Sequence, residues 1–232
     1  MTEDNEFLNL ARIKEEFIAN ASHELKTPIA SIRLAAESAL KSIKLSDGMA
    51  ESFIEQIMRD SDRMNDLITD LLDLSFLESK EVDKDNIDLN EIILQEISFL
   101  SKQNKKRIGY KKVKNSIVYA NYDDVSVALK NLIRNALKYS PQEENVFIKI
   151  GNKDESVVVS IQDFGSGISL EDQEKIFERF YRVDKGRSRK LGGTGLGLAI
   201  VKHAAERNNI EIDIESSVGF GSIFKLIFHK VN

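Results

Sequence analysis

Apolar residues recur every seven positions along the first eighty residues of the chain. From about residue 6 to residue 43, one series consists of Ile18, Leu25, Ile32 and Ala39. A second series follows three positions later and widens the stripe, as in the helices of a bundle. A turn signal at residues 45–48 is followed by the same periodicity over residues 49–79. The pattern therefore predicts two long helices joined as an antiparallel hairpin.

A lone hairpin would leave half of this apolar stripe in contact with water. Pairing with a second copy would bury the stripe, which predicts a homodimeric four-helix bundle. The alternative is that the stripe packs against the remainder of the same chain. Of the two interpretations we favour the homodimer.

Helix and strand patterns alternate after a charged linker at residues 81–86. A short strand is expected at residues 87–89, followed by a helix that Asn90 caps. The basic run at residues 102–114 is expected to be a solvated connection and strand edge. The next helix is expected to be capped by Asp123 and to end before a proline.

The last third of the chain predicts four strands and two helices. Strands are expected at residues 146–150 and 157–161, and the second is apolar enough to be buried on both faces. Ser169 and Asp172 form a capping signature for a helix over residues 170–180. A basic loop, a glycine-rich helix start and two closing strands at residues 210–215 and 222–228 complete the pattern.

These patterns define the predicted fold class, α plus α/β. Residues 1–80 are expected to form the helical hairpin of the dimeric four-helix bundle. Residues 81–86 form the linker, and residues 87–232 form an α/β sandwich domain.

Composition excludes several classes of function. The chain has 232 residues and a net charge of −5, which argues against a partner that is nucleic acid. It has no cysteine, so disulfides and thiolate metal sites are absent. No apolar run is long enough to span a membrane, and no signal peptide is visible. We expect a cytoplasmic piece of a longer protein, which segments outside this chain could anchor to a membrane.

His23 stands on the polar face of the first helix. With Ile18 at a seam position, His23 falls at heptad position f and should face solvent. Glu24 is adjacent and Thr27 lies one turn away on the same face. A neutral imidazole can accept phosphate, and a carboxylate can orient its proton. The alternative is a surface histidine without a role, but Pro28 favours function, because a proline inside a helix costs about 3 kcal/mol.

The familiar nucleotide-binding motifs are missing. The chain contains no G-x-x-x-x-G-K-[ST] sequence, and residues 193–197 read G-x-G-x-G with no strand before them. Residues 163–165 spell D-F-G but lack the H-R-D and V-A-I-K sequences of kinases that act on hydroxyl groups. A Walker A site, a dinucleotide fold and a hydroxyl-directed kinase are therefore disfavoured.

Three weaker signals occur together in a fixed order. Asn131 and Asn135, four residues apart on a helix, offer amide oxygens that suit Mg²⁺. Asp163, at the end of a strand, can accept a hydrogen bond from the adenine amino group. Residues 193–197 can cradle phosphates with backbone N–H groups at a helix start. Each signal alone is more often an ordinary surface feature, but the combination predicts a site for ATP and Mg²⁺.

The same residues resemble the motifs of the cytoplasmic core of bacterial sensor histidine kinases. The phosphoacceptor, asparagine, first glycine, phenylalanine and second glycine boxes of that family resemble residues 17–28, 131–141, 163–168, 177–182 and 193–198. The resemblance covers nearly the whole chain. It implies a dimerisation and phosphoacceptor domain followed by a Bergerat-type ATP-binding domain.

The resemblance also implies a role for each matching residue of the catalytic set. His23 would be the phosphorylated residue, and Glu24 would be its acid/base partner. Thr27 would orient water when phosphate is removed from the partner protein. Asn135 would ligate Mg²⁺, and Asn131 would lie close to the metal and the phosphates.

Further residues would bind the nucleotide. Lys138 and Arg182 would contact phosphate oxygens, Tyr139 would line the pocket, and Asp163 would read adenine. The remaining positions implied by the glycine boxes are Gly165, Gly167, Ile168, Gly193, Thr194, Gly195, Leu196 and Gly197.

Two positions depart from the family pattern. Phe164 stands where a polar residue is more common, and Asn208-Asn209 replaces a glycine pair. Asparagine tolerates the left-handed backbone better than most residues, so we expect the turn at Asn209 to be kept. Neither position touches the expected chemistry.

The implied function is autophosphorylation of His23 by ATP, followed by transfer of the phosphate to an aspartate on a response-regulator receiver domain. The presence of Thr27 also suggests phosphatase activity toward that partner. One alternative is an ATPase of the gyrase or Hsp90 type, which would release phosphate without labelling the protein. Another is a non-catalytic dimeric scaffold, which would not require ATP, and a third is a net phosphatase.

Overall fold

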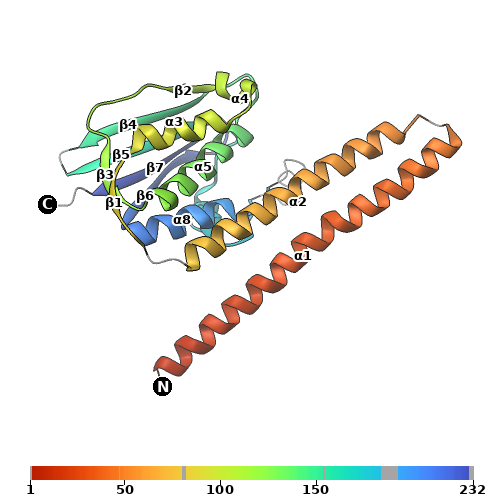
Figure 1. Cartoon of the computed structure of the whole chain (residues 1–232), viewed down its shortest axis with the longest axis horizontal. Coiled ribbons are helices and arrows are strands. Elements are labelled where there is room, and N and C mark those ends of the chain that lie inside the picture. The colour runs from red at the N-terminus through yellow and green to blue at the C-terminus, as the bar shows by residue number, and fades with distance from the viewer. Residues whose placement is uncertain (1, 47, 80–81, 154, 184–192, 230–232) are drawn as a thin grey trace. The chain divides into compact units, whose positions relative to one another are not determined.

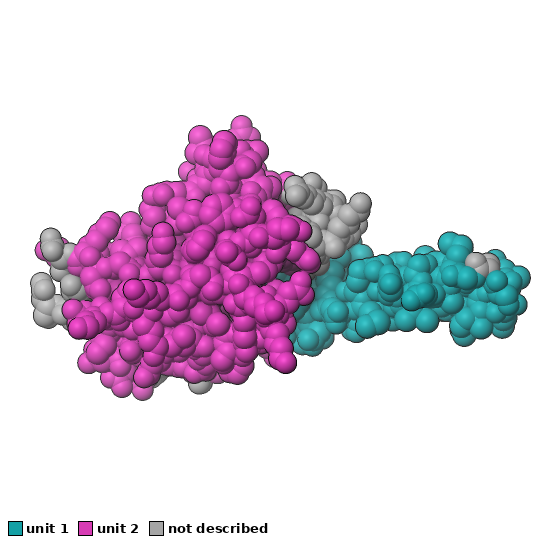
Figure 2. Space-filling view, turned by 90° about the horizontal axis from the view of Figure 1, so that it is seen from above, with its two compact units in different colours: residues 1–71, 184–194 teal, residues 72–183, 195–232 magenta. Residues whose placement is uncertain are grey.

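The structure is a computed structural model that describes residues 2–46, 48–79, 82–153, 155–183 and 193–229. The chain divides into two compact units, shown in two colours in Figure 2. The first unit contains residues 1–71 and 184–194, and the second contains residues 72–183 and 195–232.

Two long helices make up most of the first unit, and residues 72–79 of the second helix belong to the second unit. Helix α1 (Thr2–Leu45) and helix α2 (Ala50–Ser79) run in opposite directions on either side of a short turn (Figure 1). The predicted helical hairpin is thus confirmed. Helix α1 continues through Pro28. None of the helices in the described part of the chain is long and apolar enough to cross a membrane.

Polar and small residues join the two helices of the hairpin. The Ser31 hydroxyl donates a hydrogen bond to Asp60 Oδ2 at 2.6 Å and accepts one from Gln56 Nε2 at 3.0 Å. Ala35 and Ala39 of the predicted seam are buried. Many larger apolar residues of the hairpin are exposed in the single chain, among them Ile18, Ile29, Leu34, Leu40, Ile43, Ile54 and Met58. An apolar surface of this kind is typical of an association interface.

A mixed five-stranded sheet forms the centre of the second unit, in the order β2-β4-β5-β7-β6. Its strands are β2 (Ile108–Tyr110), β4 (Val146–Lys153), β5 (Ser156–Asp163), β6 (Ile210–Ser217) and β7 (Gly221–His229). Strand β2 is parallel to β4, and the other neighbours are antiparallel. A separate antiparallel pair is formed by β1 (Asp85–Asp88) and β3 (Ile117–Ala120).

Helices lie along one face of this sheet (Figure 1). They are α3 (Leu89–Phe99), α5 (Tyr122–Tyr139) and α8 (Gly197–Asn208), and α5 packs against both of the other two. The core between helices and sheet contains Leu129, Leu132, Ile161, Ile200 and Leu226, none of them more than 1% exposed. The predicted α/β layer architecture is therefore confirmed.

Strand β5 corrects one expectation from the sequence. Val157, Val159 and Ile161 are buried, whereas Val158 and Ser160 between them are only half-buried. Burial alternates because helices cover one face of an antiparallel region, whereas a strand buried on both faces needs two covering layers.

Helix starts differ from the predicted caps at two places. The N-cap of α5 is Asn121, whose side chain accepts a hydrogen bond from the Asp124 N–H, so Asp123 is not the cap. Asp88 caps α3 in place of Asn90 by accepting from the Asn90 N–H. Several side chains near a helix start can serve as caps, so pattern alone misplaced the start.

Other boundaries are shorter or longer than the sequence suggested. Ser169 caps α6 (Leu170–Gln173) as predicted, but this helix ends early and only a 3-10 turn, η1 (Lys175–Phe177), follows. The expected turn at Asn209 is confirmed, because this residue ends α8 with a φ of 56°. Most of the predicted basic loop, residues 184–192, lies outside the described residues.

The basic run at residues 102–114 contains the predicted edge strand and, in addition, a short helix that was not predicted. The helix is α4 (Lys102–Lys106), and the strand is β2. Arg107 between them donates hydrogen bonds to four backbone carbonyls, those of Leu137, Ser140, Pro141 and Glu144, at 2.7 to 3.3 Å. Carbonyls at a helix end lack partners within the helix, so Arg107 caps the C-terminus of α5.

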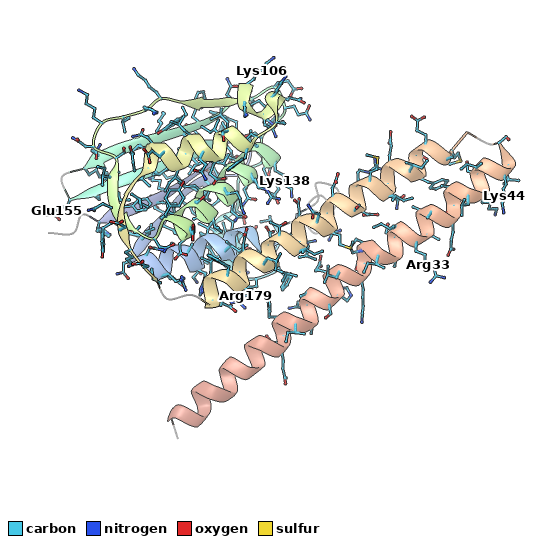
Figure 3. All side chains as sticks on the ribbon, viewed as in Figure 1. Arg33, Lys44, Lys106, Lys138, Glu155 and Arg179 are labelled. Carbon is cyan, nitrogen blue, oxygen red and sulfur yellow. The ribbon has the colours of Figure 1, made fainter. Side chains whose placement is uncertain are left out.

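Replacing Arg107 with alanine is expected to destabilise the second unit by about 1–3 kcal/mol, because several carbonyls at the end of α5 lose a charged donor. Urea unfolding followed by circular dichroism measures the change. Lys106→Ala is the matched control, since Lys106 is exposed and extends outward from this unit (Figure 3). Equal stability of the two variants would contradict the capping role.

Candidate functional site

His23 lies on the exposed side of α1, and Glu24 and Thr27 near it are half-buried. The side chain of His23 is exposed, as its heptad position predicts. The Thr27 hydroxyl donates a hydrogen bond to the His23 backbone carbonyl at 3.1 Å. The imidazole is therefore presented to solvent, with a hydroxyl held one turn away.

Glu24 has a partner that the sequence did not indicate. Its Oε2 accepts a hydrogen bond from Arg63 of α2 at 2.8 Å, and the Arg63 side chain is only 8% exposed. This ion pair fixes the direction of the carboxylate next to His23. Arg63 adjoins the apolar seam, but no spacing rule pairs residues 39 positions apart.

In the second unit, the first residue of α8 lies against both asparagines of α5. Asn131 is 4% exposed, and its Nδ2 donates to the Val127 carbonyl at 2.9 Å. A Cβ atom added to Gly197 would lie 3.0 Å from Asn131 Oδ1 and 3.7 Å from Asn135 Nδ2. The structure thus brings the asparagine box and the second glycine box together at the N-terminus of a helix, where anions are favoured.

Asp163 ends strand β5 beside the other end of the asparagine box. It is 6% exposed, and its Oδ1 accepts a hydrogen bond from the Gly165 N–H at 2.8 Å. Burial raises the pKa of this carboxyl, while hydrogen bonds from Gly165 and Ser222 act in the opposite direction. A Cβ on Gly165 would lie 2.7 Å from the Tyr139 carbonyl, so only glycine allows this close approach.

At two further positions of the glycine boxes, Gly167 and Gly195, the backbone conformation and the close contacts require glycine. Gly167 has a φ of 67°, and an added Cβ would lie 1.9 Å from the Ser217 carbonyl oxygen. Gly195 has a φ of 77° and would clash with the backbone of Phe180, whose N–H donates to the Gly195 carbonyl at 2.8 Å. The second glycine box and the phenylalanine box are therefore in direct contact.

Asp172 connects the residues just before position 184 to the start of α6 through hydrogen bonds. Asp172 accepts hydrogen bonds from the Ser169 and Tyr181 hydroxyls, both at 2.6 Å. The hydrogen bond to Asp172 raises the pKa of Tyr181. Arg182, the next residue, is half-buried.

The other residues expected to bind the nucleotide differ in their exposure. Lys138 and Ile168 are half-buried, Tyr139 is 40% exposed and Leu196 is fully buried. Gly193 and Thr194 are buried and cluster with the first unit, where the Thr194 hydroxyl donates to Asp70 Oδ2 at 2.5 Å. The sequence did not indicate Asp70.

The side chains gathered here could hold Mg²⁺ only if phosphate oxygens supplied some of its other ligands. The described part of the chain contains no group of three His, Cys, Asp or Glu side chains able to hold a metal ion. Amide oxygens are hard, neutral donors; Asn131 presents its Oδ1 toward the first residue of α8, whereas Asn135 presents its Nδ2 there. Such a set suits a Mg²⁺ ion that keeps water and phosphate oxygens as its other ligands.

Two protein families match this chain. Residues 5–80 match the family described as "His Kinase A (phospho-acceptor) domain". Residues 120–232 match the family described as "Histidine kinase-, DNA gyrase B-, and HSP90-like ATPase". The first match contains His23, and the second contains the asparagine and glycine boxes.

Curated relatives agree with these matches. The chain is 36% identical to the sensor-like histidine kinase SenX3 of Mycolicibacterium smegmatis, over 97% of this chain and 59% of that protein. It is 35% identical to the sensor histidine kinase WalK of Bacillus subtilis, over 90% of this chain and 35% of that protein. The chain thus spans little more than half of the first relative and about a third of the second.

Solved structures show the same fold. The histidine kinase AdeS of Acinetobacter baumannii superposes with a TM-score of 0.65 at 22% identity, covering 90% of this chain and 98% of that one. Full-length ShkA in complex with AMPPNP superposes with a TM-score of 0.58 at 20% identity, covering 94% of this chain and 46% of that one. With both domain families present in order, the chain belongs to the sensor histidine kinases of two-component systems.

Proposed function

We propose that this chain transfers the γ-phosphoryl group of ATP to His23 and then passes it to an aspartate on a response-regulator receiver domain. The observation that carries the proposal is the approach of Gly197 to Asn131 and Asn135. A helix N-terminus beside the side-chain amides of two asparagines suits a polyphosphate with its metal ion. The first unit supplies an exposed histidine as acceptor.

In the proposed transfer, the lone pair of a neutral imidazole nitrogen of His23 forms a bond to the γ-phosphorus. The bond from that phosphorus to the bridging oxygen breaks at the same time, and ADP leaves with the electron pair. Glu24 accepts a hydrogen bond from the other ring nitrogen, and Arg63 holds the carboxylate in place. Catalysis rests mainly on positioning and on neutralisation of phosphate charge.

The nucleotide residues of the second unit divide this task. Asp163 accepts from the adenine amino group, and Tyr139 lines the pocket. Asn135 would hold Mg²⁺, with Asn131 beside it, and a bound Mg²⁺ would supply neutralisation of phosphate charge. Lys138 and Arg182 add positive charge at the phosphates. The glycine boxes allow the backbone to approach the nucleotide closely.

The proposal includes a homodimer and a partner protein. The exposed apolar residues of the hairpin support pairing with a second copy, because a monomer rarely leaves such a stripe in water. Exposure of His23 lets a receiver domain and ATP use the same acceptor in turn. The hydroxyl of Thr27, one turn from His23, supports phosphatase activity toward the receiver. Both ATP and the receiver imply a cytoplasmic site.

His23→Gln is expected to abolish labelling of the protein by γ-labelled ATP, because glutamine has no nucleophilic ring nitrogen. The label on the unchanged chain should be acid-labile and base-stable, as a phosphoramidate is. Labelling that persists in the variant would show that another residue is the acceptor. Phosphate release without any labelling would favour the ATPase of the gyrase or Hsp90 type.

Asn135→Ala is expected to reduce labelling of His23 by at least about a hundredfold, since a ligand of Mg²⁺ and its charge neutralisation are lost. Sedimentation should show the same dimer for the variant and the unchanged chain. Asn145→Ala is the matched control, an exposed asparagine of the same unit. Labelling that survives in Asn135→Ala would contradict the proposed role of Asn135 as a metal ligand. If the unchanged chain did not bind ATP, the non-catalytic dimeric scaffold would be favoured instead.

Asp163→Asn is expected to weaken ATP binding at least about tenfold. The amide oxygen of the variant would accept from the Gly165 N–H, and the amide nitrogen left for the adenine amino group cannot accept a hydrogen bond. Calorimetry with ATP and with GTP measures the effect on each nucleotide. The preference for ATP over GTP should fall. An unchanged preference would contradict the adenine-reading role of Asp163.

A further inference from the structure

The turn that joins β6 to β7 forms a surface against which the first glycine box lies. A Cβ atom on Gly167 would lie 1.9 Å from the Ser217 carbonyl oxygen, so the two backbones are in contact. The Gly219 N–H donates a hydrogen bond to the Ser166 carbonyl at 2.7 Å. The middle of the box therefore follows the shape of this turn, and all of these residues belong to the second unit.

Both backbone polar groups of Ile168, the last residue of the box, have partners beyond the box. The Ile168 N–H donates a hydrogen bond to the Ser216 hydroxyl oxygen at 2.8 Å. The Ile168 carbonyl accepts one from Gln173 Nε2 at 3.1 Å, and the same nitrogen donates to the Ser216 carbonyl at 3.1 Å. A single side-chain amide, that of Gln173, thus joins the end of the box to the end of β6.

The same turn also contacts the beginning of the box. Ser222 lies opposite Asp163 in the register of β7 and β5, and it forms hydrogen bonds to the Asp163 carboxyl. The hydroxyl oxygens of Ser222 and Ser216 are 2.9 Å apart, and the Ser216 hydroxyl donates to the Gly221 carbonyl at 3.0 Å. A continuous set of polar contacts therefore runs from Gln173 through the turn to Asp163.

The chemistry of Gln173 suits its position, because the two groups that its Nε2 contacts are both carbonyl oxygens. Only a donor can face two acceptors, and a side-chain amide carries two N–H groups on one nitrogen. Gln173 is half-buried and is the last residue of α6, the short helix that Ser169 caps. The backbone of α6 therefore fixes the point from which the amide extends.

We propose that Gln173 is a positioning residue for nucleotide binding, which holds the first glycine box in its binding conformation on the β6–β7 turn. The inference rests on the ATP site proposed above and adds to it a residue outside all five boxes. Gln173 acts through the backbone of Ile168 and Ser216. A box that already has its binding conformation avoids the ordering cost that a loose loop incurs when a ligand binds.

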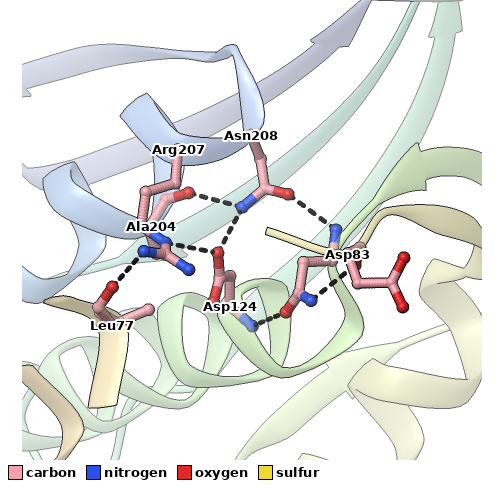
Figure 4. A network of polar contacts seen from close by, with 7 residues as sticks. Leu77, Asp83, Asp124, Ala204, Arg207 and Asn208 are labelled. Carbon is pink, nitrogen blue, oxygen red and sulfur yellow. Dashed lines mark hydrogen bonds and ion pairs between the residues drawn. The ribbon is translucent and has the colours of Figure 1, made fainter. Parts of the chain in front are cut away.

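A second polar network in the same unit provides a comparison (Figure 4). Asn208 Nδ2 donates hydrogen bonds to Asp124 Oδ2 at 2.9 Å and to the Ala204 carbonyl at 2.8 Å. Asn208 Oδ1 accepts one from the Asn121 N–H at 2.7 Å. This network lies at the start of α5, whereas the glycine box lies beside Tyr139 at the end of that helix. The 18 residues of α5 separate the two places by about 25 Å.

The test compares four variants of the full chain. Gln173→Glu keeps the shape of the side chain but presents a carboxylate to two carbonyl oxygens, and Gln173→Met keeps its length without a donor. Gln103→Glu is the matched control, because Gln103 is an exposed glutamine of α4 and undergoes the same change of charge. Asn208→Ala is the control for stability, because it removes several hydrogen bonds far from the box.

Three quantities are measured for each variant. Calorimetry gives the ATP dissociation constant, urea unfolding gives the stability, and hydrogen exchange without nucleotide reports on the backbone of residues 165–169. A residue that only supports the fold would change ATP affinity in proportion to stability. A positioning residue changes the affinity and the exchange of the box by more than its effect on stability explains.

We expect Gln173→Glu to raise the ATP dissociation constant about fivefold or more and Gln173→Met to raise it about threefold, because the box must then be ordered on binding. Hydrogen exchange at residues 165–169 should become faster in both variants and stay unchanged in Gln103→Glu. Asn208→Ala should lower the urea midpoint at least as much as Gln173→Glu does, with the ATP dissociation constant changed less than about twofold.

Three results would overturn the inference. They are an ATP dissociation constant that changes less than about twofold in both Gln173 variants, unchanged hydrogen exchange at residues 165–169, and an equal loss of ATP affinity in Asn208→Ala. If the unchanged chain binds no ATP, the proposed function fails and the inference falls with it. If the unchanged chain and every variant bind ATP equally well, only the role of Gln173 is rejected.

Discussion

The close packing of α8 against α5 is the contact on which the proposed nucleotide site depends. Gly197 has no side chain, so the first turn of α8 can lie against Asn131 and Asn135. A single Cβ atom would lie 3.0 Å from Asn131 Oδ1, so the Asn131 side chain would have to shift. The N-terminus of α8 and the two asparagine side chains lie together because this approach is possible, and the other boxes lie around them.

Glycines and polar clamps have complementary parts in this architecture. Gly165, Gly167 and Gly195 let loops touch neighbouring backbone, which brings residues of distant segments together. Arg107 and Arg207 hold helix ends through backbone carbonyls. Apolar packing of helices on the sheet supplies most of the stability, while these contacts determine where the functional side chains lie.

Local patterns predicted much of the fold. Seven-residue periodicity gave both long helices and the exposed position of His23, and capping chemistry gave the start of α6 at Ser169. Local patterns misplaced the cap at Asn121, where several side chains could serve as caps. They also missed the partial exposure of Val158, because burial of a strand depends on how many layers cover the sheet. The candidate site residues came from motifs that the sequence displays in order.

Such local patterns could not predict contacts between side chains that are far apart in the sequence. The pairing of Glu24 with Arg63, the cap that Arg107 provides and the hydrogen bond from Arg207 to the Leu77 carbonyl all require the folded chain. They also concern charged residues, which a sequence alone assigns to the solvent. The most direct measurement is peptide mapping of the chain after incubation with ATP and Mg²⁺. We expect a phosphoramidate on the peptide that contains His23. Phosphate on a different residue, or none on the chain, would contradict the proposed transfer.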